Sequence, residues 1–284
     1  MRKCLFALLI CLILPTQAMA NEREVYIALG DSLAAGQTPY SQIDAGYTDF
    51  IAMQLQKKGK LAHFTKELTF PGYRVSDVKN TVQSERAERL LQDATVITIS
   101  AGANDLLPLI AHNPQQGTVN FSQLQANFAL NNVREEMAQL LQLVREKAPK
   151  ADVYVMGYYF PYVSVHPEQL QGATAALQLL NAILAQVAEQ AGMNFVDVYE
   201  RFDENRANYL PNKGDVHPNQ HGYLLMANAM LQSYSGDNSL QLQANHLPAP
   251  NPKSFEQMLE QRESFQSTAR AAVHSNKTPI AIHV

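Results

Sequence analysis

The sequence predicts an α/β protein of three layers, α/β/α, in which helices cover both faces of a mainly parallel, five-stranded sheet. Three observations predict this class. Strand-like and helix-like segments alternate along the chain, which is typical of parallel strands joined by helices. The run ATVITISAG (94–102) is β-branched and nearly uncharged, as expected of a strand buried on both faces. The 284 residues also suffice for the core of one such domain.

Each strand of the predicted sheet is a short run with few charges. The first is a buried apolar run, and the second alternates in part and ends at Pro71-Gly72. In chain order, the expected strands are EVYIALG (24–30), HFTKELTF (63–70), ATVITISAG (94–102), DVYVMGYYF (152–160) and NFVDVYE (194–200).

The helices expected between and after these strands have helical spacing of apolar residues or recognisable ends. Ser76 and Asp77 suit a helix N-terminus, while Pro149 and Gly192 follow the last residues of two long helices. Pro218 suits the first position of the last helix, which would place His217 at its cap. In order, the expected helices are 47–56, 76–92, 121–147, 167–191 and 219–233.

The first twenty residues have the pattern of a secretory signal peptide. Basic Arg2 and Lys3 precede an apolar stretch, and small residues stand at Ala18 and Ala20. The apolar stretch, 4–14, is shorter than the ~20 residues that span a membrane. We therefore expect cleavage near Ala20, a secreted protein in the periplasm or outside the cell, and no stable membrane anchor afterwards. Retention as an uncleaved anchor is the alternative.

Removal of this segment also removes both cysteines, Cys4 and Cys11. The mature chain would then have no disulfide, no thiol nucleophile and no cysteine ligand for a metal. Without Arg2 and Lys3, the 22 basic residues become 20 against 26 acidic ones, a net charge of −6 with neutral histidines. A mildly acidic chain without a basic run gives no support for nucleic-acid binding.

The composition shifts near Ser235 to Asn, Gln, Ser and Pro, as in HLPAPNPKS. This pattern predicts a linker, a polar helix-prone stretch near 255–273 and a frayed end. The expected organisation is therefore a signal peptide at 1–20, one domain at 21–234 and a polar extension at 235–284 that is partly helical or disordered.

Suggestive residues follow the ends of the predicted strands, where the active groups of a doubly wound sheet lie. Their types suit acyl transfer. A serine hydroxyl attacks once an imidazole takes its proton, and a carboxylate orients that imidazole. Backbone N–H groups or an Asn amide can stabilise the oxyanion. Three segments come at strand ends: Gly30-Asp31-Ser32, Pro71-Gly72 and Gly102-Ala103-Asn104-Asp105. The fourth, Asp215-Val216-His217-Pro218-Asn219, comes much later, before the last helix.

Taken in this order, GDSLAAG (30–36), the glycine after the second strand, GAND (102–105) and HPNQHGY (217–223) resemble the four blocks of the SGNH or GDSL-type serine esterases and lipases. The overall layout is similar to a secreted bacterial branch. The resemblance covers roughly 25–232 and implies a flavodoxin-like sheet and ester hydrolysis, without a metal or organic cofactor.

The same resemblance implies a role for each matching residue. Ser32 would be the nucleophile and would lend its backbone N–H to the oxyanion hole. Gly72 would give a second backbone N–H, and Asn104 a side-chain amide; Asn104 could instead cap a helix, and Gly72 could serve only the turn. His217 would act as general base and then general acid. Asp31 is expected to order the turn.

The histidine block departs from the family pattern, which places the acid three residues before the histidine. That position is Gly214 here, and Asp215 stands only two residues before His217. Either Asp215 still reaches the imidazole, or a backbone carbonyl orients it and leaves a dyad. The surroundings of Gly72 also lack the Asn-x-Gly often seen in the family. His221 has no Glu partner or third ligand for zinc, so a surface or packing role is expected.

The expected function is that of a secreted hydrolase acting on short- to medium-chain carboxylic esters of lipids or lysophospholipids. The aromatic run YYFPY (158–162) is expected to pack in the core or to line an acyl or sugar pocket. One alternative is removal of acetyl groups from a polysaccharide or cell-wall glycan. Another is a non-catalytic domain that binds a glycan or lipid.

Overall fold

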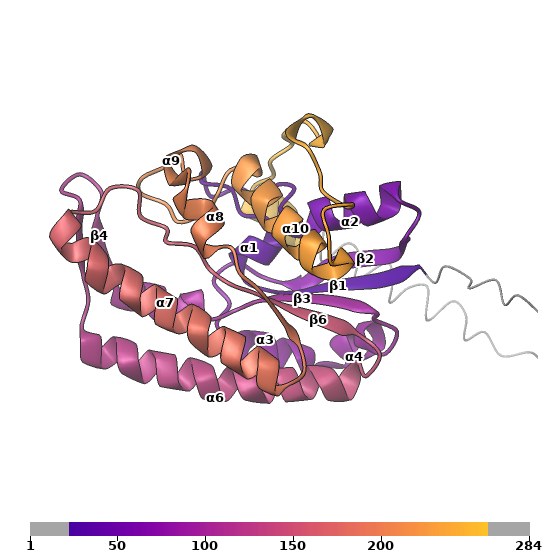
Figure 1. The fold of residues 1–284 in the computed structure, drawn as a ribbon. Coiled ribbons are helices and arrows are strands. Elements are labelled where there is room, and N and C mark those ends of the chain that lie inside the picture. The colour runs from indigo at the N-terminus through magenta and orange to yellow at the C-terminus, as the bar shows by residue number, and fades with distance from the viewer. Residues whose placement is uncertain (1–22, 261–284) are drawn as a thin grey trace, which may run out of the picture.

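A computed structural model describes residues 23–260 of the protein (Figure 1). The predicted signal peptide at 1–20, and the part of the predicted C-terminal helix beyond residue 260, lie outside these described residues.

A five-stranded parallel sheet forms the middle layer, as predicted from the alternation of strands and helices. The strand order is β2-β1-β3-β6-β7, so the chain runs outward from β1 to β2 and then returns past β1 to β3. This reversal opens a crevice at the carboxyl ends of β1 and β3, where ligands bind in doubly wound sheets. The strands are β1 (Glu24–Gly30), β2 (Leu61–Thr69), β3 (Val96–Ser100), β6 (Asp152–Met156) and β7 (Asn194–Val196).

Helices cover both faces of the sheet (Figure 1). One face carries α1 (Ser32–Ala35), α2 (Tyr47–Lys57), α8 (Tyr199–Asp203), α9 (Arg206–Tyr209) and α10 (Gln220–Ser235). The other carries α3 (Val75–Val82), α4 (Glu85–Leu91), α6 (Gln123–Lys147) and α7 (Pro167–Gln190). By length and composition α7 could cross a membrane, but it packs against α6 and β7, which accounts for its apolar residues.

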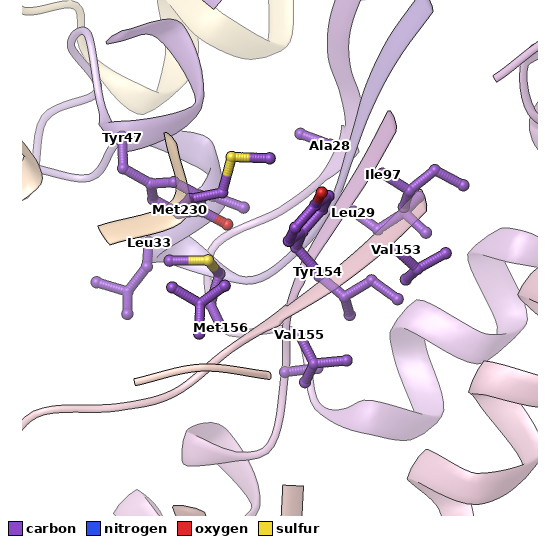
Figure 2. Close-up of a cluster of buried hydrophobic side chains, with 14 of the residues drawn as sticks. Ala28, Leu29, Leu33, Tyr47, Ile97, Val153, Tyr154, Val155, Met156 and Met230 are labelled. Carbon is purple, nitrogen blue, oxygen red and sulfur yellow. The ribbon is translucent and has the colours of Figure 1, made fainter. Parts of the chain in front are cut away.

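The core fills the space between the sheet and each helical layer. Figure 2 shows one part of it, where Met156 lies with Leu33, Tyr47 and Met230. These side chains come from β6 and from α1, α2 and α10, and all are buried. Burial of such apolar surface is the main stabilising contribution in a domain without disulfides.

Several elements differ from the sequence prediction. The strands expected at 152–160 and 194–200 end earlier, at Met156 and Val196, and the short helices α8 and α9 follow the second of them. The single helix expected at 76–92 is two helices, α3 and α4, because the Ser84 hydroxyl accepts a hydrogen bond from the N–H of Ala87 (3.2 Å) and caps a new helix. The segment after β3 contains two short helices, α5 (Ala103–Leu106) and η1 (Leu107–Leu109), followed by an unpredicted hairpin of β4 (Ala111–Asn113) and β5 (Thr118–Asn120).

Residues 236–260 pack against the domain. Leu240 and Leu242 are buried in the main core, and residues 255–260 are helical. The described part of the C-terminal extension is therefore in contact with the core and continuous with it.

Candidate active site

The turn after β1 places a serine at the carboxyl edge of the sheet. Gly30 has a φ of +133°, and a Cβ there would lie 2.2 Å from the carbonyl oxygen of Ser100. Only glycine fits this close approach of β1 to β3. Asp31 then caps α1 by accepting the N–H of Leu33 (3.0 Å), and Ser32 is the first residue of that helix. Ser32 is only 8% exposed.

The buried carboxylate of Asp31 orders this turn through its hydrogen bonds, as expected. Its carboxylate also accepts hydrogen bonds from the hydroxyls of Ser100 (3.0 Å) and Tyr158 (2.7 Å). Burial raises the pKa of Asp31, while the hydrogen bonds from Tyr158, the Leu33 N–H and Ser100 oppose that shift. The network fixes the backbone that carries Ser32.

His217 and Asp215 complete a hydrogen-bonded line with Ser32. His217 Nε2 lies 2.7 Å from Ser32 Oγ, and His217 Nδ1 lies 2.7 Å from Asp215 Oδ1. Since a carboxylate can only accept, Nδ1 carries the proton and Nε2 is free to accept from the serine hydroxyl. The structure thus brings together three of the predicted residues, with the Asp215 carboxylate rather than a backbone carbonyl at Nδ1.

The loop before α10 makes this geometry possible. Asn219, not His217, caps α10, because its Oδ1 accepts the N–H groups of His221 (3.0 Å) and Gly222 (3.1 Å). The expectation that His217 caps the helix is therefore wrong. Free of the helix, His217 reaches Ser32, and Tyr159 holds the loop by donating to the carbonyl of Val216 (2.8 Å).

Gln37 is a neighbour of the imidazole that the sequence did not indicate. Its side-chain Nε2 lies 3.4 Å from His217 Nδ1, and its backbone N–H donates to the carbonyl of Ser32 (2.9 Å). Its own carbonyl accepts from the hydroxyl of Tyr223 (2.6 Å). A glutamine after a turn has no motif of its own, so only its position in the fold shows this contact.

The two remaining predicted residues occupy different places. Asn104 lies in the first turn of α5, where Gly102 holds the cap position, so Asn104 does not cap the helix. Its amide donates one hydrogen bond to the carbonyl of Tyr73 (2.9 Å), and its side chain lines the same cavity as Ser32. Gly72 is exposed in the turn after β2, with a φ of +84°, and lies outside the set of residues that line this cavity.

A deep apolar cavity opens beside Ser32 and His217. The empty space within it, together with the open solvent at its mouth, amounts to about 870 Å³. The aromatic run 158–162 forms one wall, which is one of the two positions expected for it, and β5 and the start of α6 contribute further apolar residues. The other walls come from α5 and η1 with Leu106, Leu107 and Leu109, and from α7 with Ala173, Ala176, Leu177 and Leu180.

The α7 wall was missed because its sequence signal is ambiguous. Residues at 173, 176, 177 and 180 have the spacing of one helical face, which equally describes packing against a core. His221 is exposed on α10, and residues 23–260 contain no group of three His, Cys, Asp or Glu side chains that could hold a metal ion.

A parallel sheet with serine, histidine and aspartate in line at its carboxyl edge is typical of enzymes that transfer acyl groups through serine. Comparison with known proteins agrees. Residues 28–225 match the GDSL-like Lipase/Acylhydrolase family, and the chain belongs to this family of carboxylic ester hydrolases.

Individual relatives are distant in sequence. The chain is 20% identical over 220 residues to protein YpmR of Bacillus subtilis (strain 168), covering 76% of this chain and 84% of the relative. Among solved structures, the lipase Lip_vut3 from a goat rumen metagenome matches with a TM-score of 0.60 and 20% identity, covering 76% of this chain and 98% of that one.

Two other solved structures extend the comparison. Phospholipase A1 from Streptomyces albidoflavus NA297 matches with a TM-score of 0.55 and 20% identity, covering 73% of this chain and 98% of that one. The acetylxylan esterase Axe2 from Geobacillus stearothermophilus matches with a TM-score of 0.56 and 17% identity, covering 74% and 94%. At these identities the structures show a common fold. Solved catalytic mutants of Axe2 replace a serine, a histidine or an aspartate by alanine.

Proposed function

We propose that this protein hydrolyses carboxylic esters with apolar acyl chains through an acyl-enzyme on Ser32. The observation that carries the proposal is the hydrogen-bonded line of Ser32, His217 and Asp215 at the mouth of an apolar cavity. The catalytic mutants of Axe2 support the serine mechanism, because they replace the same three residue types, serine, histidine and aspartate.

In the first half of the reaction, Ser32 Oγ attacks the ester carbonyl carbon while His217 Nε2 takes the serine proton. The carbonyl electron pair moves to oxygen, and when the tetrahedral intermediate collapses His217 gives the proton to the leaving alcohol. In the second half, His217 takes a proton from water, whose oxygen attacks the acyl carbon. The acid is released and the proton returns to Ser32.

The other polar groups of the site support these steps. Asp215 keeps the proton on His217 Nδ1 and stabilises the imidazolium that forms when Nε2 accepts a proton. One N–H of Asn104 is bound by Tyr73, which fixes the amide, and its second N–H and the backbone N–H of Ser32 are the donors we assign to the oxyanion. Gly72 remains a candidate third donor whose exposed position gives it less support.

The cavity favours acyl chains longer than acetate. Its walls are almost entirely aliphatic and aromatic, and burial of each CH₂ of a bound chain contributes ~0.8 kcal/mol. An acetyl group would leave most of this apolar surface uncovered. Hydrolysis of acetylated glycans remains the second candidate, because an acetylxylan esterase is among the proteins of the same fold. A non-catalytic binding domain has least support, since serine, histidine and aspartate are all present and aligned.

A direct test uses p-nitrophenyl esters from acetate to dodecanoate, together with acetylated xylan. Hydrolysis that rises from acetate to medium chains is expected, and it should be abolished by Ser32→Ala but kept by Ser233→Ala, which replaces an exposed serine on α10. Release of acetate from xylan without hydrolysis of longer esters would favour the second candidate. Equal hydrolysis by Ser32→Ala would contradict a serine mechanism altogether.

We also propose that the mature enzyme is secreted after cleavage near Ala20. The basic, apolar and small-residue pattern of the first twenty residues supports this. Sequencing the N-terminus of protein recovered outside the inner membrane tests it. A chain that still begins at Met1 would contradict cleavage.

A further inference from the structure

The C-terminal segment, residues 236–260, lies beyond the family match, which ends at residue 225, yet it is firmly attached to the domain. Leu240 and Leu242 are buried in the core. Asn228 on α10 donates to the carbonyl of Leu242 (2.9 Å) and accepts from its N–H (2.8 Å), and Gln54 on α2 donates to the carbonyl of Leu240 (2.9 Å). The beginning of the segment is thus anchored on two helices.

Farther along, the segment pairs with the loop that follows the nucleophile. Lys253 and Ile43 exchange two backbone hydrogen bonds, of 2.8 and 2.9 Å, in an antiparallel bridge. Ile43 in turn bridges Gln37. Gln37 contacts both Ser32 and His217. Its backbone N–H donates to the carbonyl of Ser32, and its side-chain amide lies 3.4 Å from His217 Nδ1. A short chain of contacts therefore joins Lys253 to the Ser32–His217 pair.

A second set of contacts leads to the oxyanion side. The ring of Phe255 meets the ring of Phe70 edge-on, with centroids 5.8 Å apart and an interplanar angle of 83°. Phe70 packs on Tyr73 with centroids 5.3 Å apart, and the Tyr73 carbonyl accepts the amide of Asn104 (2.9 Å). The segment thus reaches both ends of the site.

The loop at 37–46 needs such support. It has no regular secondary structure apart from the isolated bridges at Gln37 and Ile43. Ser41 within it has a φ of +57°, a left-handed conformation that a non-glycine residue keeps only when its surroundings hold it. Asp44 adds a third tie to the segment, by accepting the N–H of Asn251 (3.1 Å).

We propose that Lys253, through its backbone, and Phe255, through its ring, are positioning residues for ester hydrolysis, holding the 37–46 loop and the 70–73 turn in the geometry that the reaction needs. The proposal rests on the proposed function of Ser32. Neither residue touches the reacting atoms. Misplacement of a catalytic group by about 1 Å can lower a rate about 100-fold, so loss of either support is expected to act on the chemical step.

The Lys253 contact is tested by two substitutions in the full chain. Lys253→Pro removes the N–H that donates to Ile43, while Glu256→Ala, at an exposed neighbouring position, keeps both backbone hydrogen bonds. With the preferred p-nitrophenyl ester, we expect kcat of Lys253→Pro to fall about tenfold or more with KM within about twofold of the wild type. Glu256→Ala should stay within about twofold in both. Equal kcat for all three proteins would overturn this half of the proposal.

The Phe255 contact is tested with Phe255→Ala, with Phe255→Tyr as the conservative variant and exposed Glu256→Ala as the neighbour control. We expect Phe255→Ala to weaken binding of a trifluoromethyl ketone analogue of the substrate by the same factor as kcat/KM. Binding of the carboxylate product should be unchanged, and Phe255→Tyr should restore both values. If Phe255→Ala weakened binding of the ketone and of the carboxylate by the same factor and also lowered the thermal stability, the role of Phe255 would be purely structural. That result would overturn the proposal. Absence of Ser32-dependent activity in the wild type would instead overturn the proposed function.

Discussion

His217 Nδ1 lies 2.7 Å from a carboxylate oxygen of Asp215, although only one residue separates the two in the sequence. The same oxygen, Oδ1, also accepts the backbone N–H of His217 (2.7 Å). This local turn brings the carboxylate beside the ring, so the family's spacing of three residues is not needed for the contact. Asn212 supports the turn by accepting the N–H of Gly214 (3.1 Å) and, at its carbonyl, that of Asp215 (3.1 Å).

The first prediction concerns this carboxylate. Asp215→Asn is expected to lower kcat by about 100- to 10,000-fold, because an amide can impose the wrong imidazole tautomer and cannot stabilise the imidazolium. Steady-state hydrolysis of the preferred p-nitrophenyl ester measures the effect. Asp93→Asn, at an exposed position, serves as the control. Nearly full activity of Asp215→Asn would leave orientation of His217 to a backbone group.

The second prediction concerns the oxyanion. Asn104→Ala is expected to lower kcat about 100- to 1,000-fold with little change in KM, because the amide acts on charge that develops only in the transition state. Exposed Asn127→Ala is the matched control. A variant that raised KM and kept kcat would show that Asn104 binds the ground-state ester instead.

The third prediction concerns the length of the acyl chain. Ala173→Leu or Ala176→Leu fills part of the cavity, so kcat/KM for octanoate should fall about tenfold or more while that for acetate changes little, as expected from ~0.8 kcal/mol per lost CH₂ contact. Ala175→Leu adds the same side chain to the exposed face of α7 and should change neither. Equal losses for acetate and octanoate would place the acyl chain elsewhere.

The fourth prediction is the effect of pH on stability through Asp105. Burial, followed by the charge of Glu136, raises the pKa of Asp105 from 3.8 to about 6, against the hydrogen bond from the Val75 N–H. The native state therefore keeps a proton that the unfolded state has lost between about pH 4 and pH 6, and stability falls as pH rises through this window. Because this carboxyl is partly exposed, the expected loss is ~1–2 kcal/mol rather than the full value of the shift.

Asp105→Asn removes this titration and can still accept the Val75 N–H. Urea unfolding should find the variant more stable than the wild type at pH 7, with the difference vanishing near pH 4. An equal difference at both pH values would mean that ionisation of Asp105 is not responsible.

Much of the fold followed from local patterns in the sequence. The strand at 94–102 has no charge to conflict with burial, and the long helices at 121–147 and 167–191 have clear ends, so each was found within a few residues. The break at Ser84 was missed because one serine in a polar stretch looks the same inside a helix as at its cap. The hairpin of β4 and β5 has strands of only three residues, too short for a period to show.

The site was predictable where chemistry limits the residue type. Ser32, His217 and Asp215 were singled out because each follows a strand end or precedes a helix in a recognisable block, and the structure places them in one hydrogen-bonded line. Gln37 and Phe255 were not found, because their contacts with His217 and Phe70 depend on loop pairing between distant parts of the chain.

The measurement that tests the central claim most directly is trapping of the acyl-enzyme. Acid quenching of the enzyme during turnover of p-nitrophenyl octanoate, followed by mass spectrometry of its peptides, should find the octanoyl group on the peptide that contains Ser32. His217→Ala should show no such adduct at the same times, because its serine lacks a base. An octanoyl group on another residue, or turnover without any adduct and without a burst of nitrophenol, would contradict the account.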